Sequence, residues 1–137
     1  MNITFCRYDS TGRYTAKCVG DEAAMLREAG NLFVGDIDIE RYYHNLETNL
    51  PEEMPIRPSM FHLFDFTEKC WVLDSISAWY SVRSQRNIRI AESDWVLLPD
   101  ISMPELKKNE WIVYRQQLRD VTSQLDPLNI AWPTPPQ

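Results

Sequence analysis

The spacing of apolar residues changes once along the chain, near Asp74, and this change limits the kind of fold that the chain can adopt. Before Asp74, β-prone runs only a few residues long alternate with turn-forming residues, as in short antiparallel strands. After Asp74, apolar residues mostly recur at steps of three to five, the spacing of helices that bury one face. The sequence therefore predicts an α+β protein, with a β-rich unit followed by a helical unit.

The N-terminal part opens on a predicted hairpin and a short helix. Residues 3–8 and 14–19 are β-prone runs joined by turn-forming residues that include Gly12, a composition typical of a β-hairpin. Residues 22–29 begin with an acidic residue and are followed at once by Gly30. Acidic side chains favour a first helical turn and glycine favours a helix end, so these signals bracket a short helix.

The rest of the N-terminal part predicts further short strands. Residues 31–57 carry β-prone apolar residues interrupted by Gly35 and by prolines, and this composition favours short strands and long turns over a helix. Residues 60–66 and 70–73 are separated by a short polar run and predict another hairpin. We identify no internal repeat in the sequence.

The C-terminal part predicts two antiparallel helices. Asp74 or Ser75 can cap a first helix that ends near Glu92. A second helix is expected to begin near Pro104, since proline suits a first helical turn, and to end near Gln124. The apolar residues at roughly helical spacing are Ile76, Trp79, Tyr80, Val82, Ile88 and Ile90 in the first helix and Leu106, Trp111, Tyr114, Leu118, Val121 and Leu125 in the second. The connector between the helices allows them to fold back on each other.

The chain therefore divides into three predicted parts. Residues 1–73 form the small β-rich unit, residues 74–125 the helical hairpin and residues 126–137 an extended tail. The tail contains four prolines, which exclude a helix and favour a polyproline conformation near the end. A proline-rich end is usually frayed unless contacts hold it, so an ordered tail would lie along a neighbouring chain or along its own hairpin.

The charge of the chain argues against nucleic acid as a partner. The chain has 14 basic and 20 acidic residues, which gives a net charge of −6. Phosphate binding requires a basic surface, and neither half of the sequence supplies one. The N-terminus lacks the pattern of a signal peptide, and no stretch is long and apolar enough to cross a bilayer. We therefore expect neither nucleic acid nor a membrane among the partners.

The sequence offers no recognisable set of residues for catalysis or cofactor binding. Its four glycines are isolated, so it lacks the glycine-rich loops that hold nucleotide phosphates. No GxSxG motif is present, and the local contexts of His44 and His62 favour partly buried, hydrogen-bonded side chains over a base or a metal ligand. Glu52 and Glu53 lie between prolines and are interpreted as part of a solvated loop, not as a catalytic pair. We expect no cofactor, no metal and no enzymatic activity.

The three cysteines are expected to be reduced. Cys6, Cys18 and Cys70 cannot all pair within one chain, and they lack CxxC spacing. These features favour structural thiols in a reducing compartment. Cys6 and Cys18 flank the turn at Gly12, however, so a disulfide between them stays open as an alternative in a purified, oxidised sample.

The richest group of functional-type side chains lies in the predicted helical hairpin and the tail. The candidate partner-binding residues are Trp95, Trp111, Tyr114, Arg115, Arg119 and Trp132. Helical spacing places both arginines near the core side of the second helix, and the connector supplies Asp94 and Asp100 as carboxylate partners. One interpretation is structural: tryptophans fill the interior while arginine–aspartate pairs pin the connector to the helix. The other is a partner-binding hot spot, because exposed Trp, Tyr and Arg favour interfaces.

The same residues carry a resemblance to a known family. The motifs are Arg86 through Ser93-Asp94-Trp95, the Leu98-Pro99-Asp100 connector, Trp111 with Tyr114 to Asp120, and Asn129-Ile130-Ala131-Trp132-Pro133. Together they resemble the C-terminal module of phage tail assembly chaperones, also called tail fibre assembly proteins. The resemblance implies a small non-enzymatic protein of a phage or prophage that helps a tail fibre or another tail protein to fold or assemble.

Three classes of function follow as hypotheses. The leading one is a chaperone in the host bacterial cytoplasm that binds a tail fibre or another tail protein and shields its apolar or strand-edge surface until assembly. The second is a structural component that stays in the virion, at the tail, the baseplate or the fibre attachment. The third is an enzyme that acts on host surface glycan, which no motif in the sequence supports.

Overall fold

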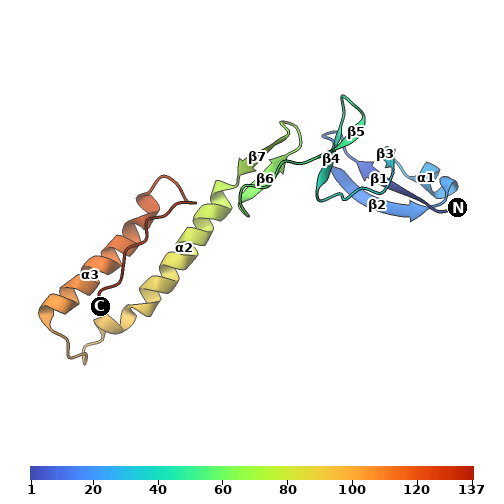
Figure 1. Cartoon of the computed structure of the whole chain (residues 1–137). Helices are drawn as coiled ribbons and strands as arrows, with labels where there is room; N and C mark the ends of the chain where they lie inside the picture. Colours follow the sequence, from blue (N-terminus) through green and yellow to red (C-terminus); the bar gives the residue numbers. More distant parts are fainter. The chain divides into compact units, whose positions relative to one another are not determined.

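The computed structural model describes the whole chain, residues 1–137, and confirms the predicted α+β fold. The chain divides into two compact units, Met1–Leu73 and Asp74–Gln137. The first unit contains all the strands and one short helix, and the second contains the two long helices (Figure 1). None of the helices combines the length and the apolar composition that a membrane crossing requires.

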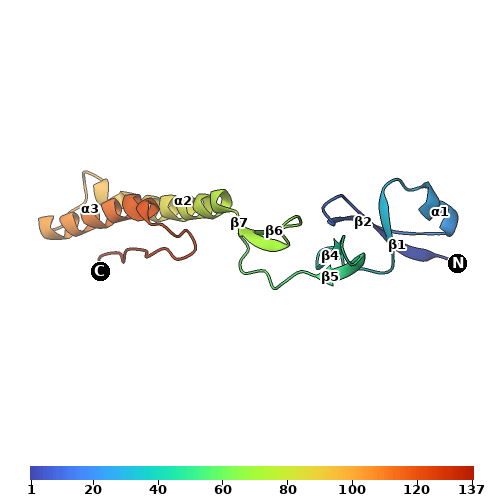
Figure 2. The same cartoon turned by 90° about the horizontal axis from the view of Figure 1, so that it is seen from above.

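Three antiparallel strands form the sheet of the N-terminal unit (Figures 1 and 2). β1 (Ile3–Tyr8) lies between β2 (Tyr14–Gly20) and β3 (Asn31–Val34). β1 and β2 are the predicted hairpin, and α1 (Glu22–Arg27) lies where the short helix was predicted. The side chain of Asp21 starts this helix by accepting a hydrogen bond from a backbone N–H of its first turn, 2.7 Å away.

Two shorter hairpins follow the sheet. β4 (Tyr42–Asn45) pairs with β5 (Leu50–Glu53), and β6 (His62–Asp65) pairs with β7 (Cys70–Leu73), both antiparallel. The β6–β7 pair confirms the second predicted hairpin. The short strands β3, β4 and β5 agree with the strands and turns expected in the preceding segment.

The two short hairpins repeat one structure at a fixed spacing. Asn45 ends β4, and Asp65 ends β6 with the same strand register 20 residues later. In each turn the side-chain oxygen of this residue accepts hydrogen bonds from two backbone N–H groups. Each turn closes with a left-handed residue, Asn49 at φ 58° or Lys69 at φ 55°. This repeat was not predicted, because the equivalent strand residues differ in type.

Contacts at the turn between β1 and β2 join the hairpins into one unit. The backbone N–H of His44 donates to the carbonyl of Gly12 at 2.7 Å. The ammonium group of Lys69 donates to the carbonyl of Thr11 at 2.6 Å and lies 4.9 Å from the ring centre of Tyr43. Gly12 has a φ of 85°, and a Cβ atom there would overlap the carbonyl oxygen of His44. Glycine is therefore required at this position.

His44 lies in the core of the N-terminal unit. The buried side chains of this core are Phe5, Cys6, Tyr14, Tyr43 and His44. The imidazole Nδ1 lies 3.0 Å from the hydroxyl of Tyr14, and Nε2 lies 2.9 Å from the side-chain oxygen of Asn49. An amide oxygen only accepts hydrogen bonds, so Nε2 donates to Asn49 and Nδ1 accepts from Tyr14. Burial raises the pKa of Tyr14 to about 12, which keeps its hydroxyl protonated as the donor.

The cysteines are free, and the strand register explains why the alternative disulfide does not form. Cys18 lies opposite Phe5, whereas Cys6 lies opposite Lys17. Opposed residues of antiparallel strands share a face and successive residues alternate between faces, so Cys6 and Cys18 point to opposite sides of the sheet. Cys6 is buried and Cys70 is exposed, and all three thiols are unpaired.

The interpretation of Glu52 and Glu53 as a solvated loop was wrong, because both belong to β5. The carboxylate of Glu52 accepts from the hydroxyl of Tyr43 at 2.6 Å and from the side-chain amide of Asn45 at 2.7 Å. These bonds lower the pKa of Glu52, and the bond from Tyr43 raises the pKa of that hydroxyl to about 12. Glu53 forms an ion pair with Arg41. Both carboxylates therefore hold β5 against β4.

The C-terminal unit is the predicted antiparallel helical hairpin (Figures 1 and 2). α2 (Ser75–Glu92) is followed by a 3₁₀ turn, η1 (Asp94–Leu97), and then by α3 (Glu105–Asp120). A second 3₁₀ turn, η2 (Val121–Ser123), takes the place of the last predicted turn of the second helix. Pro104 directly precedes α3, one residue before the first helical turn.

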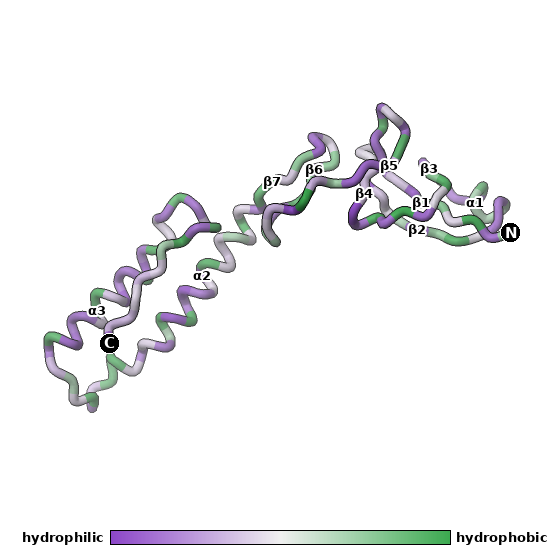
Figure 3. The backbone as a smooth tube through the Cα atoms, in the orientation of Figure 1, coloured by the Kyte–Doolittle hydropathy of each residue, from purple (hydrophilic) through white to green (hydrophobic).

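The packed faces of the two helices are narrower than the sequence pattern indicated. The buried apolar side chains of the helices and turns are Ala78, Val82, Val96, Tyr114, Leu118 and Val121. Figure 3 shows hydrophilic and hydrophobic residues alternating along both helices. Several positions of the predicted apolar pattern are instead exposed, namely Ile76, Tyr80, Ile88, Leu106 and Leu125. A hairpin of two helices buries only the stripe where they meet, so apolar residues beyond this stripe stay in solvent.

Asp74 caps α2 and makes the stability of the C-terminal unit depend on pH. Its carboxylate accepts from the hydroxyl of Ser77 at 2.5 Å and from the backbone N–H of the same residue at 3.1 Å. These two bonds lower the pKa of Asp74 below its ordinary value of 3.8. The stabilisation is therefore complete above the unfolded-state pKa and is lost as the pH falls through the lower pKa of the folded state.

Asp74→Ala is accordingly expected to lower the melting temperature at pH 7, because the cap is lost. The difference from wild type should shrink once the pH falls below 3.8, the ordinary pKa of this carboxyl group. Asp74→Asn is the matched control, since asparagine also caps helices but has no charge to titrate. Thermal unfolding followed by circular dichroism from pH 7 to pH 2.5 measures the effect. A wild-type advantage over Asp74→Ala that does not change with pH would contradict this account.

Candidate functional site

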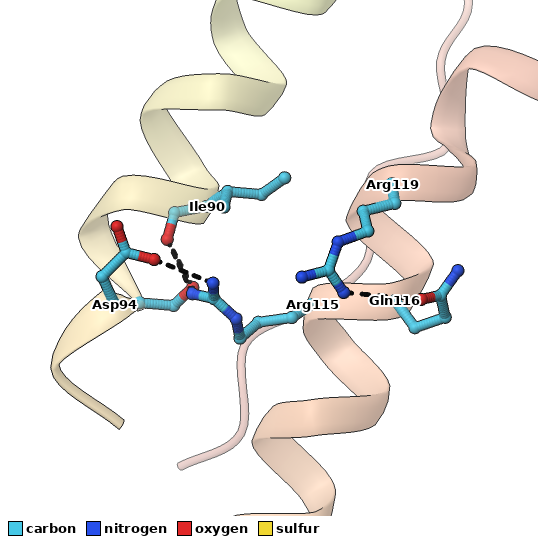
Figure 4. A network of polar contacts seen from close by, with 6 residues as sticks. Ile90, Asp94, Arg115, Gln116 and Arg119 are labelled. Atoms are coloured by element: carbon cyan, nitrogen blue, oxygen red, sulfur yellow. Dashed lines mark hydrogen bonds and ion pairs between the residues drawn. The ribbon is translucent and has the colours of Figure 1, made fainter. Parts of the chain in front are cut away.

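Arg115 is buried and ties α3 to the end of α2 (Figure 4). Its side chain is 5% exposed, and one guanidinium nitrogen donates to the carbonyl of Ile90 at 2.9 Å and to the hydroxyl of Ser93 at 2.6 Å. The other terminal nitrogen lies 2.8 Å from a carboxylate oxygen of Asp94. The hydroxyl of Ser93 donates in turn to the carbonyl of Ile90 at 2.7 Å. Ser93 was not among the candidate site residues predicted from the sequence. The Arg115–Asp94 pair therefore has the predicted structural role.

Arg119 does not share this role, and the expectation that both arginines point toward the core was wrong. Figure 4 shows the side chain of Arg119 beside Gln116 of the same helix, and the nitrogen–oxygen distance between them is 3.4 Å. Arg119 is exposed, and neither it nor Asp100 forms an ion pair. Because α3 turns by about 100° per residue, a position four residues after Arg115 lies about 40° around the helix from it. This displacement places Arg119 outside the narrow packed stripe.

Trp95, Trp111 and Tyr114 form an aromatic cluster between η1 and α3. The ring centres of Trp95 and Trp111 are 5.4 Å apart with an interplanar angle of 71°. The ring centres of Trp111 and Tyr114 are 5.7 Å apart with an interplanar angle of 84°. Both pairs have the edge-to-face geometry that aromatic rings favour. Tyr114 is buried, Trp111 is half-buried and Trp95 is 41% exposed, so the cluster leads from the core to the surface.

Trp132 lies apart from this cluster and holds the C-terminal segment to the hairpin. The guanidinium carbon of Arg89 in α2 lies 4.4 Å from the centre of the Trp132 ring, a cation–π contact. Gln124 fixes the preceding residue: its side-chain oxygen accepts from the backbone N–H of Ala131 at 2.8 Å, and its side-chain nitrogen donates to the carbonyl of the same residue at 3.1 Å. Sequence reasoning missed Gln124 because an amide paired with a backbone seven residues away leaves no pattern.

The segment after η2 turns back and runs along the hairpin, as Figures 1 and 2 both show. It contains no regular secondary structure from Asp126 to Gln137 beyond a turn at its start. Between this segment and α3 lies a groove of about 440 Å³, lined on one side by Leu106, Val113 and Tyr114 and on the other by Pro136. Leu106 and Val113 are exposed, so the floor of the groove is an apolar surface open to solvent.

The helical unit as a whole exposes many large apolar side chains. These are Ile76, Tyr80, Ile88, Trp95, Leu97, Leu98, Ile101, Leu106, Ile112, Val113, Leu125 and Leu128. Single exposed apolar residues are ordinary, but a contiguous apolar patch marks a surface that contacts protein or another apolar partner. The positions of Ile76, Tyr80 and Ile88 follow helical spacing and lie on one side of α2.

The polar groups of the structure serve to hold the fold. No group of three or more His, Cys, Asp or Glu side chains lies close enough to bind a metal ion. The nitrogens of His44 are taken by Tyr14 and Asn49, and Nδ1 of His62 lies 2.8 Å from the hydroxyl of Ser59. Both tyrosines with a strongly raised pKa, Tyr14 and Tyr43, donate hydrogen bonds within the N-terminal unit. These histidine and tyrosine side chains therefore form hydrogen bonds within the N-terminal unit.

Comparison with known proteins gives one match. Residues 79–137 match a family model described as phage tail assembly chaperone protein. The matched stretch contains all six candidate residues of the helical unit, the Arg115 network and the C-terminal segment, so the suspected resemblance is confirmed for this part of the chain. No curated protein and no solved structure matches the chain.

Proposed function

We propose, from the match of residues 79–137 to phage tail assembly chaperones, that this chain is a non-enzymatic phage or prophage protein that binds a tail fibre or another tail protein before assembly. The helical unit supplies the binding surface. Trp95, which is 41% exposed, and Arg119 are the candidate residues free to contact a partner, whereas Tyr114 and Arg115 are buried and maintain the hairpin.

The observation that carries the proposal is the set of exposed apolar side chains within the matched stretch, among them Tyr80, Leu106 and Val113. An unassembled fibre exposes apolar surface and strand edges that aggregate unless they are covered. A helical hairpin that keeps apolar residues in solvent can cover such a surface for a time and release it when the fibre subunits associate. The binding energy comes from apolar burial and needs no cofactor.

The alternative, a structural component retained in the virion, has less support. An ordered proline-rich end would favour it if a neighbouring chain were needed to hold that end. The contacts of Gln124 with Ala131 and of Arg89 with Trp132 hold the segment on its own hairpin. Mass spectrometry of purified particles distinguishes the two proposals, because a chaperone is expected to be missing from the virion and a component is expected in stoichiometric amounts.

Coexpression tests the proposed function directly. A tail fibre gene from the same phage or prophage is expressed with and without the gene of this chain, and the soluble trimeric fibre is measured by size-exclusion chromatography with light scattering. We expect soluble trimer only in the presence of the chain. Trp95→Ala should lower this yield, and a thermal unfolding measurement of the variant separates lost partner binding from the lost edge-to-face contact with Trp111. Lys108→Ala is the control, since Lys108 is an exposed, polar residue of the same unit and forms no ion pair. A fibre that is equally soluble and trimeric without the chain would rule out the proposal.

A further inference from the structure

We propose that a cleft in the N-terminal unit binds an extended, acidic segment of the tail protein. This inference rests on the proposed function and adds a second site outside the matched residues 79–137. The cleft has a volume of about 710 Å³ and is open to solvent. Its lining includes the start of β2, the strands β6 and β7, and the loop that precedes them. Six of its lining residues can contact such a ligand or position the side chains that do: Arg13, Tyr14, Arg57, Phe64, Phe66 and Trp71.

The charge of the cleft favours an acidic ligand. Residues 1–73 carry seven basic and twelve acidic side chains, so positive charge is scarce in this unit. Three of its cations are neutralised in ion pairs: Arg7 with Glu28, Lys17 with Asp36 and Arg41 with Glu53. Arg13 and Arg57 form no ion pair, and both line the cleft, which contains a single carboxylate, that of Glu40. The cleft is therefore a basic site on an acidic unit, and guanidinium groups bind carboxylates with charge-assisted hydrogen bonds.

Aromatic side chains in fixed contact with one another form one side of the cleft. The ring of Phe64 lies edge-to-face with those of Phe66 and Trp71, at centre distances of 5.1 Å and 5.2 Å. The guanidinium carbon of Arg13 lies 5.7 Å from the centre of Phe66, and that of Arg57 lies 5.7 Å from Trp71. The rings hold the two cations at the cleft without neutralising them. An arrangement already in place loses little entropy when a ligand binds.

The donors of Arg57 show how much of the cation stays free. Its guanidinium donates to the carbonyls of Met60 and His62, both at 2.8 Å. One terminal nitrogen therefore remains for a ligand. The side chain of Arg13 makes no hydrogen bond with the chain, so its whole guanidinium group is available. Arg13 is consequently the residue whose substitution changes ligand binding with the least effect on the fold.

The free edges of two strands beside the cleft favour an extended ligand. β2 is an outer strand of its sheet and β6 has one partner, so each has an edge without a neighbouring strand. Both strands contribute residues to the cleft, Tyr14 and Thr15 from β2 and Leu63 and Phe64 from β6. Free strand edges bind extended peptides through backbone hydrogen bonds, while side-chain pockets give specificity. An unassembled tail protein supplies such segments before its strands pair.

The test uses the full chain and synthetic peptides that tile the sequence of the tail fibre protein used in the coexpression experiment. Binding is measured by fluorescence anisotropy of the labelled peptides. We expect the tightest peptides to contain Asp or Glu, and replacing these by Asn or Gln should weaken binding about tenfold. Arg13→Gln should weaken binding of the same peptides about tenfold, Arg13→Glu should weaken it further, and Arg13→Lys should retain most of it. Arg27→Gln is the matched control, because Arg27 is exposed in the same unit, forms no ion pair and lies outside the cleft.

Three outcomes would overturn the inference. The first is that uncharged peptides bind as tightly as acidic ones. The second is an affinity of Arg13→Gln equal to that of the wild type, and the third is an equal loss of affinity in Arg27→Gln. Thermal unfolding of each variant identifies losses of fold. The coexpression experiment is independent of these results: a chain that rescues the fibre but binds no acidic peptide contradicts only the cleft proposal. A chain that binds the peptides but rescues no fibre contradicts the chaperone proposal.

Discussion

Gly12→Ala is expected to lower the free energy of unfolding of the N-terminal unit by about 3 to 5 kcal/mol. Two costs add. The backbone at Gly12 has a φ of 85°, a conformation that side chains other than glycine disfavour. The new methyl group would also overlap the carbonyl of His44, so the hydrogen bond from the His44 N–H to the Gly12 carbonyl could not keep its 2.7 Å length. Differential scanning calorimetry and amide hydrogen exchange at His44 measure the loss.

Gly30→Ala separates the two costs. Gly30 also has a left-handed backbone, with a φ of 109°, but the nearest atom to an added Cβ would be an Arg7 side-chain carbon at 3.8 Å. Only the conformational cost applies there, about 1 to 2 kcal/mol. Equal destabilisation by the two substitutions would mean that the contact between Gly12 and His44 does not join the first turn to β4. A larger loss in Gly12→Ala, together with faster exchange of the His44 amide, is the expected outcome.

Arg115→Ala is expected to destabilise the C-terminal unit by about 2 to 4 kcal/mol. The substitution removes the donors to Ile90 and Ser93 from a buried position and leaves space where the arginine stem was packed. The remaining carboxylate of Asp94 is 60% exposed, so water can solvate it and the loss comes from the buried acceptors and from packing. Urea unfolding followed by tryptophan fluorescence reports on this unit, because Trp79, Trp95, Trp111 and Trp132 all lie in it.

Arg119→Ala is the matched control, since it removes the same side chain four residues along α3 from an exposed position. Its expected cost is within about 0.5 kcal/mol. Arg115→Lys adds a finer test, because a single ammonium group replaces the planar fork and cannot reach the same three acceptors. If Arg115→Ala and Arg119→Ala had the same small effect, the buried network would contribute nothing to stability, and Arg115 would return to the list of partner-binding candidates.

The sequence predicted those parts of the fold that local signals determine. Gly12 marked the first hairpin, and the period of apolar residues marked both helices, as the structure confirms. The cap of α2 was narrowed to Asp74 or Ser75, and the side chain of Asp74 is the one that accepts the capping bond. These features depend on residues within a few positions of one another, which is why single residues could indicate them.

Features that depend on contacts distant in the sequence were predicted less well. Ile76, Tyr80 and Leu106 fit the helical pattern but stay exposed, because the pattern alone does not reveal how many neighbours a helix has. Arg115 and Arg119 are similar in type and close in sequence, yet only Arg115 meets the end of α2. Trp132 was grouped with the other tryptophans, whereas Arg89 holds it elsewhere on the hairpin.

The 20-residue spacing of the β4–β5 and β6–β7 hairpins has a consequence for how such chains can change in length during evolution. Each hairpin contains its own turn residues, but only β6–β7 contributes none of the buried side chains of the N-terminal core. Its contacts with the preceding elements include those of Lys69 with Thr11 and Tyr43. In-frame duplication or deletion of β6–β7 would therefore lengthen or shorten the N-terminal unit, while the buried cores of this unit and of the helical unit keep all of their residues. Genes for shorter and longer versions of this protein would then differ by multiples of one hairpin.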